Sequence, residues 1–473
     1  MVFTELRFVW FFLLAFSIYW LLRSNTWRKV WLLGCSYVFY GAWDWRFLAL
    51  LWLSTGVDYA VGWALGRYSQ LAVRRTLLWL SLAGNLGMLG VFKYFGFFVD
   101  SAQDFCTLVG LPFRTETLSI VLPIGISFYT FQTLNYVIDV YRGRMPPTRS
   151  LLDFALFVTF FPHLVAGPIV RAHDFLPQFA RLRRWDWLRM NLGVQLLILG
   201  LVKKLVIGDR MALFADPVFA APENYQTGAL WIGALAFALQ LYGDFSGYSD
   251  MAVGLAHMLG YKLAKNFDMP YASPNISDFW RRWHISLSSW LRDYLYVPLG
   301  GSRCAWWRSD LNLLITMVLS GLWHGANWTF VLWGALHGIM LVAHRHFRGW
   351  ASERPWISGP LLSVPGTALR IALTFTLFTL SLVLFRAASL DQALTMLGRM
   401  FQPSLGAGLP MNDRGLWYTV ILVVLCHAAG AWKLNRLVGR LPAPVQGLSY
   451  AAVASLALIL SPELGKAFVY FQF

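Results

Sequence analysis

Long apolar stretches separated by short basic segments dominate the hydrophobic pattern of the chain. A helix that crosses the hydrocarbon core of a bilayer needs about 20 mostly apolar residues. Ten stretches approach this description, and we predict a membrane-spanning helix at each of them. They are Phe8–Leu22, Val30–Trp43, Phe47–Leu65, Leu77–Phe92, Leu118–Val140, Met190–Ile207, Gly228–Tyr242, Ala368–Phe385, Leu416–Trp432 and Leu448–Leu460.

Four further apolar stretches are less regular: Phe154–Val170, Met251–Leu259, Leu311–Trp323 and Phe330–Ala343. The first contains Pro162, Gly167 and Pro168, and basic residues such as Arg149 and Arg184 lie on both sides of it. Since basic loops stay in the cytoplasm, we predict a re-entrant segment that enters and leaves on that side. Irregular backbone at membrane depth must be buried in protein or line a wet cavity. We therefore predict a cytoplasmic cavity at this segment.

Basic residues also suggest the orientation of the chain. Clusters of Lys and Arg follow the first, third and fifth predicted helices, so we assign these alternate loops to the cytoplasm and the N-terminus to the outside. The clusters are Arg23, Arg28 and Lys29; Arg67, Arg74 and Arg75; and Arg142, Arg144 and Arg149.

The stretch SGLWHGANW, Ser320–Trp328, places a histidine between two of the irregular apolar stretches. Each of the two stretches is short for a full span, and basic residues lie on both outer sides, among them Arg345 and Arg348. We predict that the pair dips inward from the cytoplasm and turns near Gly325–Asn327. His324 would then lie at the turn, at depth.

The composition supports the membrane class. Hydrophobic residues make up 58% of the 473 residues and charged residues 13%, against about a quarter charged in soluble domains. We attribute the net charge of +16 to cytoplasmic loops and an anionic lipid surface, because no nucleic-acid-binding motif accompanies it. The four cysteines are dispersed and predict neither disulfides nor a zinc site. The first apolar stretch lacks a cleavage site and is expected to be a retained helix, within one integral membrane domain spanning 1–473.

His324 is the first candidate for chemistry. An ionisable residue within a membrane is costly and is a functional candidate by default. An imidazole suits general-base work near neutral pH. The alternative is a core histidine bonded to a backbone carbonyl, and position and composition alone do not decide between the two.

The second candidate is FWRRWHISLSSWLRDYLYVPLGG, Phe279–Gly301, which mixes basic residues and His284 with three tryptophans. Amphipathic interfacial helices have this composition, and that interpretation is favoured by the residues alone. The functional alternative is a cationic vestibule for a phosphate-bearing donor, because arginine binds phosphate bidentately.

Smaller stretches are expected to be structural. His163 lies in the predicted re-entrant segment; Asp244 in DFSGYSD is expected to cap a helix at a break; and Lys203 and Lys204 are expected to snorkel to an interface. His344 and His346 are assigned to a basic cluster at the membrane edge. Motifs of metalloproteases, serine hydrolases, ATPases and dinucleotide-binding proteins are absent from the sequence.

Several long motifs closely resemble those of the membrane-bound O-acyltransferase family. PNISDFWRRWHISLSSWLRDYLYVPLGGSR is followed by SGLWHGANWTFVLWGALHG, and both match in the right order. FFPHLVAGPIVR, LPIGISFYTFQTLNYVIDVYRG and the C-terminal FVYFQF are similar to the bacterial alginate O-acetylation branch. The resemblance extends over the whole chain, with the core motifs at about 118–345.

This resemblance implies an all-α polytopic membrane protein with about 11–13 transmembrane helices and re-entrant segments around a central tunnel. The family's near-invariant histidine matches His324 and its second polar position matches His284, so the resemblance implies that both are catalytic. Matching motifs also supply candidates for the tunnel or the substrate contact. These candidates are Asp244, Trp280, Arg281, Arg282, Trp323 and Asn327.

The implied activity is O-acetyl transfer in the bacterial inner membrane. Acetyl-CoA or another activated acetyl donor would act as a cytoplasmic co-substrate, with no bound cofactor or metal. His324 would deprotonate an acceptor hydroxyl, and His284 or a backbone N–H would stabilise the oxyanion. The acetyl group would pass to a periplasmic SGNH-hydrolase-like partner that acetylates an alginate-like polysaccharide, with residues 387–415, helix-like from Leu390 to Met400, as one docking surface.

Three alternatives remain open from the sequence. The acylated polymer is cellulose or peptidoglycan, or the acyl group is not acetyl. In a different class, the protein is a solute transporter that uses His324 as a proton relay, although no inverted repeat is visible to support transport. The third alternative is a scaffold subunit without chemistry.

Overall fold

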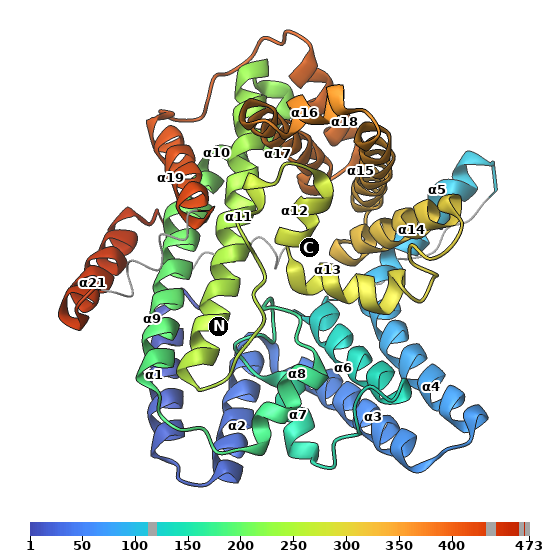
Figure 1. Ribbon diagram of the computed structural model, residues 1–473, viewed down its shortest axis with the longest axis vertical. Helices are drawn as coiled ribbons and strands as arrows, with labels where there is room; N and C mark the ends of the chain where they lie inside the picture. Colours follow the sequence, from blue (N-terminus) through green and yellow to red (C-terminus); the bar gives the residue numbers. More distant parts are fainter. Residues whose placement is uncertain (112–120, 432–440, 463–467, 469–473) are drawn as a thin grey trace. The chain divides into compact units, whose positions relative to one another are not determined.

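The computed structural model describes residues 1–111, 121–431, 441–462 and 468, and it is built from helices (Figure 1). Within these residues the only extended pairing is an isolated bridge between Tyr225 and Ala407. The all-α fold class that the motif resemblance implies is therefore confirmed.

Within the described residues, six helical stretches are long and apolar enough to cross a membrane, which makes the chain a multi-pass membrane protein. They are Asn25–Arg67, Leu71–Leu108, Trp187–Ala220, Thr227–Met258, Val364–Arg386 and Ala443–Leu460. Two shorter apolar helices, Leu6–Leu21 and Arg414–Gly430, accompany them. Each of the ten predicted spans coincides with a helix over most of its described residues; the predicted total of 11–13 spans stays a prediction.

The chain divides into two compact units, and the division runs through two long helices. Unit 1 comprises Met1–Leu197 and Met251–Ala264, and unit 2 comprises Ile198–Asp250 and Lys265–Phe473. The prediction of one domain over 1–473 stays a prediction.

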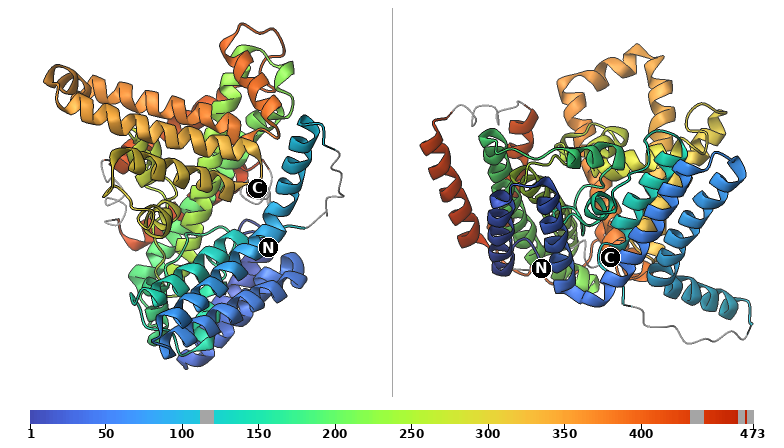
Figure 2. Two further views of the ribbon diagram at one scale, coloured as in Figure 1. Left: turned by 90° about the vertical axis from the view of Figure 1, so that its right-hand side faces the viewer. Right: turned by 90° about the horizontal axis from the view of Figure 1, so that it is seen from below.

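Unit 1 begins with helices that are adjacent in sequence and in space: α1 packs on α2, α2 on α3 and α3 on α4 (Figure 2). Its helices are α1 (Leu6–Leu21), α2 (Asn25–Asp44), α3 (Leu48–Arg67), α4 (Leu71–Leu89), α5 (Phe95–Leu108), α6 (Ile126–Tyr141), α7 (Leu151–Thr159), α8 (Ala172–Phe175) and most of α9 (Trp187–Val202). Short segments η1 (Trp45–Phe47), η2 (Gly90–Tyr94) and η3 (Leu176–Ala180) connect some of them.

Buried hydrogen bonds tie α3, α4 and α6 together. Asp58 accepts from the Ser81 hydroxyl at 2.5 Å and from the Asn85 amide at 2.8 Å. The Thr133 hydroxyl of α6 in turn donates to Asn85 at 3.2 Å. Because a buried polar group is costly unless it is satisfied, this cluster fixes the relative positions of the three helices.

Two predictions at the sixth and seventh helices are refined by the structure. The span predicted from Leu118 has its helix only from Ile126; its first three residues lie outside the described part of the chain, and 121–125 are not helical. Gly125 has φ +78°, and a Cβ there would lie 2.9 Å from the Leu164 carbonyl oxygen. The turn before α6 therefore requires glycine.

The segment predicted to be re-entrant is a broken helix. α7 contains nine residues, about 14 Å at 1.5 Å per residue, which is too short to cross a bilayer. The helix ends at Thr159, and every residue from 160 to 170 is buried. The irregular backbone is thus enclosed by protein, as the argument from membrane depth requires. The side of entry stays a prediction.

Unit 2 contains α10 (Asp209–Ala220), the larger part of α11 (Thr227–Met258) and all later helices. These are α12 (Ile276–Arg282), α13 (Ile285–Leu291), α14 (Trp306–His324), α15 (Trp328–Ser352), α16 (Pro355–Leu362), α17 (Val364–Arg386), α18 (Leu390–Phe401), α19 (Arg414–Ala431) and α21 (Ala443–Leu460). The short segments are η4 (Lys203–Gly208), η5 (Pro222–Asn224), η6 (Pro270–Ala272) and η7 (Arg292–Tyr296). The predicted helix Leu390–Met400 is confirmed as α18.

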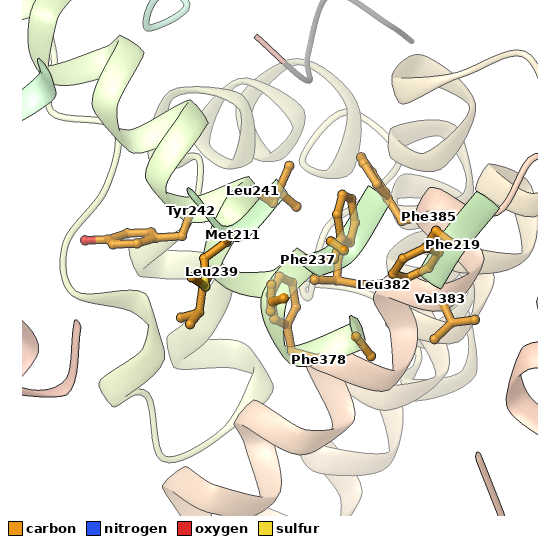
Figure 3. Packing of buried hydrophobic residues seen from close by; sticks show 14 of the residues in the cluster. Met211, Phe219, Phe237, Leu239, Leu241, Tyr242, Phe378, Leu382, Val383 and Phe385 are labelled. Carbon is orange, nitrogen blue, oxygen red and sulfur yellow. The ribbon is translucent and has the colours of Figure 1, made fainter. Parts of the chain in front are cut away.

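The core of unit 2 lies between α10, α11 and α17. Phe219, Phe237 and Leu382 come from the three helices and pack together with Phe378 and Phe385 (Figure 3). α11 is hydrophobic over most of its surface because it is surrounded by protein, as expected for a central helix. α12 and α15 also contribute side chains to this core.

The predicted helix break at DFSGYSD is wrong, since α11 runs without interruption through Asp244. The glycines of this stretch do not form a turn. They allow the backbone of α11 to lie close to the segment around Lys203. A Cβ on Gly243 would lie 2.7 Å from the Lys203 carbonyl oxygen, and one on Gly247 would lie 2.8 Å from that of Gly200. Small residues at such positions let two helical backbones approach closely.

This close approach buries Lys204 and partly buries Lys203, so the prediction that both lysines snorkel is also wrong. Lys204 is 1% exposed and forms ion pairs with Asp244 at 2.5 Å and Asp209 at 2.8 Å. Lys203 pairs with Asp250 at 2.6 Å. The apolar pattern around the lysines did not reveal these partners, because two of the three carboxylates lie 40 and 47 residues further along the chain.

The hairpin predicted around His324 is present. α14 ends at His324, Gly325 follows it, and Asn327 caps the start of α15 by accepting from the Thr329 N–H at 3.0 Å. Both helices are longer than the apolar stretches that predicted them, with 19 and 25 residues, so they are not short for a full span. Their crossing rests on glycines: a Cβ on Gly321 would lie 2.1 Å from the Phe330 carbonyl oxygen.

Candidate active site

The fold of unit 2 brings together the two histidines that the sequence singled out. His324 is the last residue of α14, and His284 immediately precedes α13. Their ring centroids lie 6.5 Å apart, and both side chains are buried. Two imidazoles at this distance can contact opposite sides of one small reacting group.

His284 has an unusual backbone conformation. Its φ of 44° and ψ of 53° are left-handed, a region that costs most residues roughly 1–2 kcal/mol. Only one other described non-glycine residue, Met269, has a positive φ. Strained residues persist where the surrounding structure over-determines them, and they cluster at functional sites.

A hydrogen bond to Asn266 fixes the tautomer of His284. The Asn266 side-chain oxygen accepts from the backbone N–H of Ser286 at 3.2 Å and from its hydroxyl at 2.9 Å. Since a backbone N–H can only donate, the contacted atom must be the amide oxygen. The same oxygen lies 3.1 Å from His284 Nδ1, which therefore carries the proton. Nε2 of the neutral ring is left with its lone pair, in the form of a base.

Asn266 is itself held in place by its other atoms. Its amide donates to the Ser249 hydroxyl of α11 at 3.1 Å, and its backbone carbonyl accepts from the Ile285 N–H at 2.9 Å. The loop before α12 is thereby joined to α11 and to the start of α13. The sequence reasoning missed Asn266, because an asparagine in a loop carries no pattern that distinguishes it from a turn residue.

Aromatic rings enclose His324. The rings of Trp323, Trp333 and Phe385 lie 4.9, 5.3 and 5.3 Å from its ring centroid to centroid. The residue is 5% exposed, so little water reaches it. Charge that develops in such a low-dielectric site is strongly influenced by the few polar groups present.

A third histidine, His337, packs against Trp333, which is one of the rings around His324. Its ring is 4.6 Å from that of Trp333, its Nδ1 accepts from the Trp280 indole N–H at 3.3 Å, and its Nε2 faces the Ser381 hydroxyl at 3.0 Å. The Ser381 hydroxyl donates to the Phe378 carbonyl, so it accepts from His337. With both nitrogens engaged, His337 supports Trp280 and Trp333. The sequence could have flagged it, as an ionisable residue within the apolar stretch Phe330–Ala343.

The structure separates the other predicted site residues into two groups. Trp323 lies beside the two histidines, with its ring centroid 6.0 Å from that of His284. Trp280 contacts Trp333, with ring centroids 5.8 Å apart, and Trp333 in turn contacts His324. Asn327 holds the hairpin turn and donates to the Ala388 carbonyl at 3.1 Å.

Three predicted residues have other surroundings. Asp244 directs its carboxylate to Lys204, although the neighbouring Phe245 packs edge-on against His284 at 4.6 Å. Arg281 is exposed, and Arg282 forms an ion pair with Asp278 at 2.8 Å. Their place in a tunnel or at the donor stays a prediction, as does the catalytic role of the two histidines.

Comparison with known proteins identifies the family. Residues 145–380, which include both histidines, match the model of the membrane-bound O-acyltransferase family. A probable alginate O-acetylase of Azotobacter vinelandii is 44% identical over 404 residues, which cover 85% of this chain and 78% of the relative. The chain belongs to the membrane-bound O-acyltransferase family. It is an acyltransferase, as the motifs predicted.

More distant relatives of the acyltransferase carry other names. A peptidoglycan O-acetyltransferase of Helicobacter pylori is 37% identical over 406 residues, covering 80% of this chain and 74% of the relative. A teichoic acid D-alanyltransferase of Bacillus subtilis is 27% identical over 271 residues, covering 53% and 65%. The three names refer to alginate, peptidoglycan and teichoic acid, and each describes the transfer of an acyl group.

Proposed function

We propose that this acyltransferase moves an acetyl group from a cytoplasmic thioester, acetyl-CoA or a similar donor, across the bacterial inner membrane for O-acetylation of an extracellular, alginate-like polysaccharide. The observation that carries the proposal is the convergence of His324 and His284, with ring centroids 6.5 Å apart in a buried site. The name of the Azotobacter relative supports the substrate class.

The proposed reaction is a direct acyl transfer. The oxygen of an acceptor hydroxyl forms a bond to the thioester carbonyl carbon while His324 takes the hydroxyl proton. The C–S bond then breaks, and the thiolate leaves and takes up a proton. General-base assistance of this kind contributes about 10²–10⁴-fold to rate.

The hydrogen bonds of His284 favour a role different from oxyanion stabilisation. His284 donates its Nδ1–H to Asn266, so its Nε2 carries a lone pair and cannot donate a hydrogen bond to an oxyanion. A better donor for the oxyanion is the Trp333 indole N–H. The Trp333 ring lies 5.3 Å from the His324 ring, and its N–H is buried and finds no acceptor among the described residues. Buried donors nearly always have an acceptor, which the developing oxyanion would supply.

The immediate acceptor in our proposal is a hydroxyl of a periplasmic partner of the SGNH-hydrolase class, which passes the acetyl group to the polymer. Peptidoglycan is the second candidate polymer, because the Helicobacter relative that bears that name covers 80% of this chain. Cellulose as the polymer and an acyl group other than acetyl are the remaining alternatives.

The test compares His324→Ala and His284→Ala with His346→Ala, a control at an exposed histidine paired with Asp310. Purified variants in lipid nanodiscs are given acetyl-CoA and an acceptor, and release of the free thiol is measured. We expect His324→Ala to lose about 10²–10⁴-fold in turnover and His284→Ala less, with the control unchanged.

A folded His324→Ala protein that turns over at the wild-type rate would refute the catalytic assignment. Complete absence of thioester consumption by the wild type, together with solute uptake into vesicles that depends on His324, would establish the transporter alternative. Analysis of acetylated polymers in a deletion strain distinguishes alginate-like polymers from peptidoglycan and cellulose.

A further inference from the structure

A cavity in unit 2 lies apart from the histidine pair. It occupies about 550 Å³ among α12, α15, α16 and α17, and neither His284 nor His324 lines it. Ligand sites in proteins typically occupy about 300–1,000 Å³. The cavity is therefore large enough to hold a ligand or part of one.

The lining of this cavity is amphipathic. Most of its apolar side chains come from α15, α16 and α17, and include Met340, Leu361, Leu373 and Leu377. The basic groups His344, Arg348 and Arg370 line the same cavity, and no Asp or Glu is among the lining residues. A site of this kind attracts a molecule with an apolar chain and an anionic group.

The two arginines have unused hydrogen-bonding capacity. Arg370 is half-buried; one terminal nitrogen donates to the Thr367 hydroxyl at 3.1 Å, while its Nε is shielded from solvent and has no acceptor among the described residues. Arg348 forms no ion pair or side-chain hydrogen bond within the part of the chain that the structure describes. A guanidinium with free N–H groups binds phosphate oxygens in a forked, two-bond geometry.

The surroundings of the cavity are suited to a lipid. α16 and the start of α17 expose large apolar side chains, with Trp356 at 74%, Leu362 at 72% and Val364 at 85%. Such a surface is expected to contact acyl chains. The predicted topology places Arg348 at the cytoplasmic side, where anionic lipids give the membrane its negative surface.

We propose that this cavity binds an anionic phospholipid, with an acyl chain against Leu361, Leu373 and Leu377 and the phosphate against Arg348 and Arg370. A zwitterionic lipid also carries a phosphate, but its ammonium group would be repelled by the basic lining. Free phosphate lacks the chain that the apolar walls accommodate. The site is independent of the acyl-transfer reaction.

The test measures the thermal unfolding midpoint of the full-length protein in detergent, followed by tryptophan fluorescence. Phosphatidylglycerol, phosphatidylcholine with the same chains, or inorganic phosphate is added. A ligand that binds only the folded state raises the midpoint as its concentration rises. We expect a rise with phosphatidylglycerol, a much smaller one with phosphatidylcholine, and none with phosphate.

The double variant Arg348→Gln/Arg370→Gln is expected to lose most of the rise. The matched control is Arg303→Gln/Arg308→Gln, which changes the charge equally at two exposed arginines outside the cavity and should keep the full rise. Ala343→Trp, which fills the cavity, should also lose the rise, whereas Ala368→Trp on the exposed side of α17 should keep it.

Each contrary result overturns the proposal. An equal rise with phosphatidylcholine would mean that the charge is not recognised, and an equal rise with phosphate would identify a small-anion site. A full rise in both the arginine and the Ala343→Trp variants would place any lipid elsewhere. The unfolding midpoint without lipid shows that each variant is folded before it is compared.

Discussion

The orientation of one imidazole depends on a single asparagine. His284 Nδ1 contacts the Asn266 oxygen, and that oxygen is identified by the backbone N–H of Ser286. The contact leaves Nε2 of His284 as the nitrogen able to accept a proton. Asn266 does not contact the reacting group in this arrangement, so it is a positioning residue.

Replacing this asparagine should therefore impair turnover more than binding. We expect Asn266→Leu to lower kcat by about 10- to 100-fold with little change in KM, as when an orienting partner of a histidine is removed. Asn266→Asp, which keeps an acceptor for the Nδ1–H, should recover part of the loss. Equal loss in both variants, accompanied by a lower unfolding midpoint, would indicate a purely structural role.

The indole of Trp333 allows a separate test at the same scale. Trp333→Phe keeps an aromatic ring beside His324 but removes the N–H. If that N–H stabilises the oxyanion, kcat should fall by about 10²–10³-fold, the loss typical of one such donor. Trp231→Phe, whose indole donates to the Met400 carbonyl away from the histidines, is the control. Unchanged kcat in Trp333→Phe would assign the oxyanion to another donor.

At the scale of helices, glycines determine how closely α14 and α15 approach each other beside His324. The His324 hairpin brings Gly321 and Gly334 against the backbone of the opposite helix, where an added Cβ would lie 2.1 and 2.3 Å from a carbonyl oxygen. The backbone at such a contact has no flexible side chain that can move aside. The contact therefore fixes the position of His324 relative to α15.

Enlarging this contact should disturb both stability and activity. We expect Gly321→Ala to lower the free energy of unfolding by about 1–3 kcal/mol, as overpacking usually does, and to reduce turnover because His324 moves. The control is Gly349→Ala in the same hairpin, where an added Cβ meets nothing within 4 Å. Wild-type stability in both variants would show that the helices separate at no cost.

The ion pairs around Lys204 act on the same scale. Lys204→Met would leave two buried carboxylates facing each other, and we expect a loss of about 3–5 kcal/mol in the free energy of unfolding. Lys265→Met, which breaks an exposed pair with Asp268, should cost less than about 1 kcal/mol. Adding Asp209→Asn and Asp244→Asn to Lys204→Met should restore much of the stability; failure to do so would show that the charges are not the cause.

At the scale of the whole molecule, the orientation in the membrane follows from the basic loops and is open to direct measurement. We expect single cysteines at positions 149 and 184, in a background without the four native cysteines, to react only with reagents that reach the cytoplasm. A cysteine at position 2 should react from the outside. Labelling of positions 149 and 184 from opposite sides would contradict the re-entrant segment.

The amino-acid sequence alone determined the class of the protein and the positions of most of the long apolar helices, and it singled out His324 as a candidate. Those features follow from local patterns: apolar runs of bilayer length, glycines around a turn, and a costly imidazole among apolar residues. The family resemblance added His284 to this set.

Only the tertiary structure decided which distant residues meet. It placed His284 beside His324, joined Asn266 to His284, and paired Lys204 with Asp244 in a helix that was expected to break. It also assembled a cavity lined by three basic residues from two helices. The physical reason is that hydrogen bonds and ion pairs act over a few ångströms in space, while the sequence pattern records only spacing along the chain.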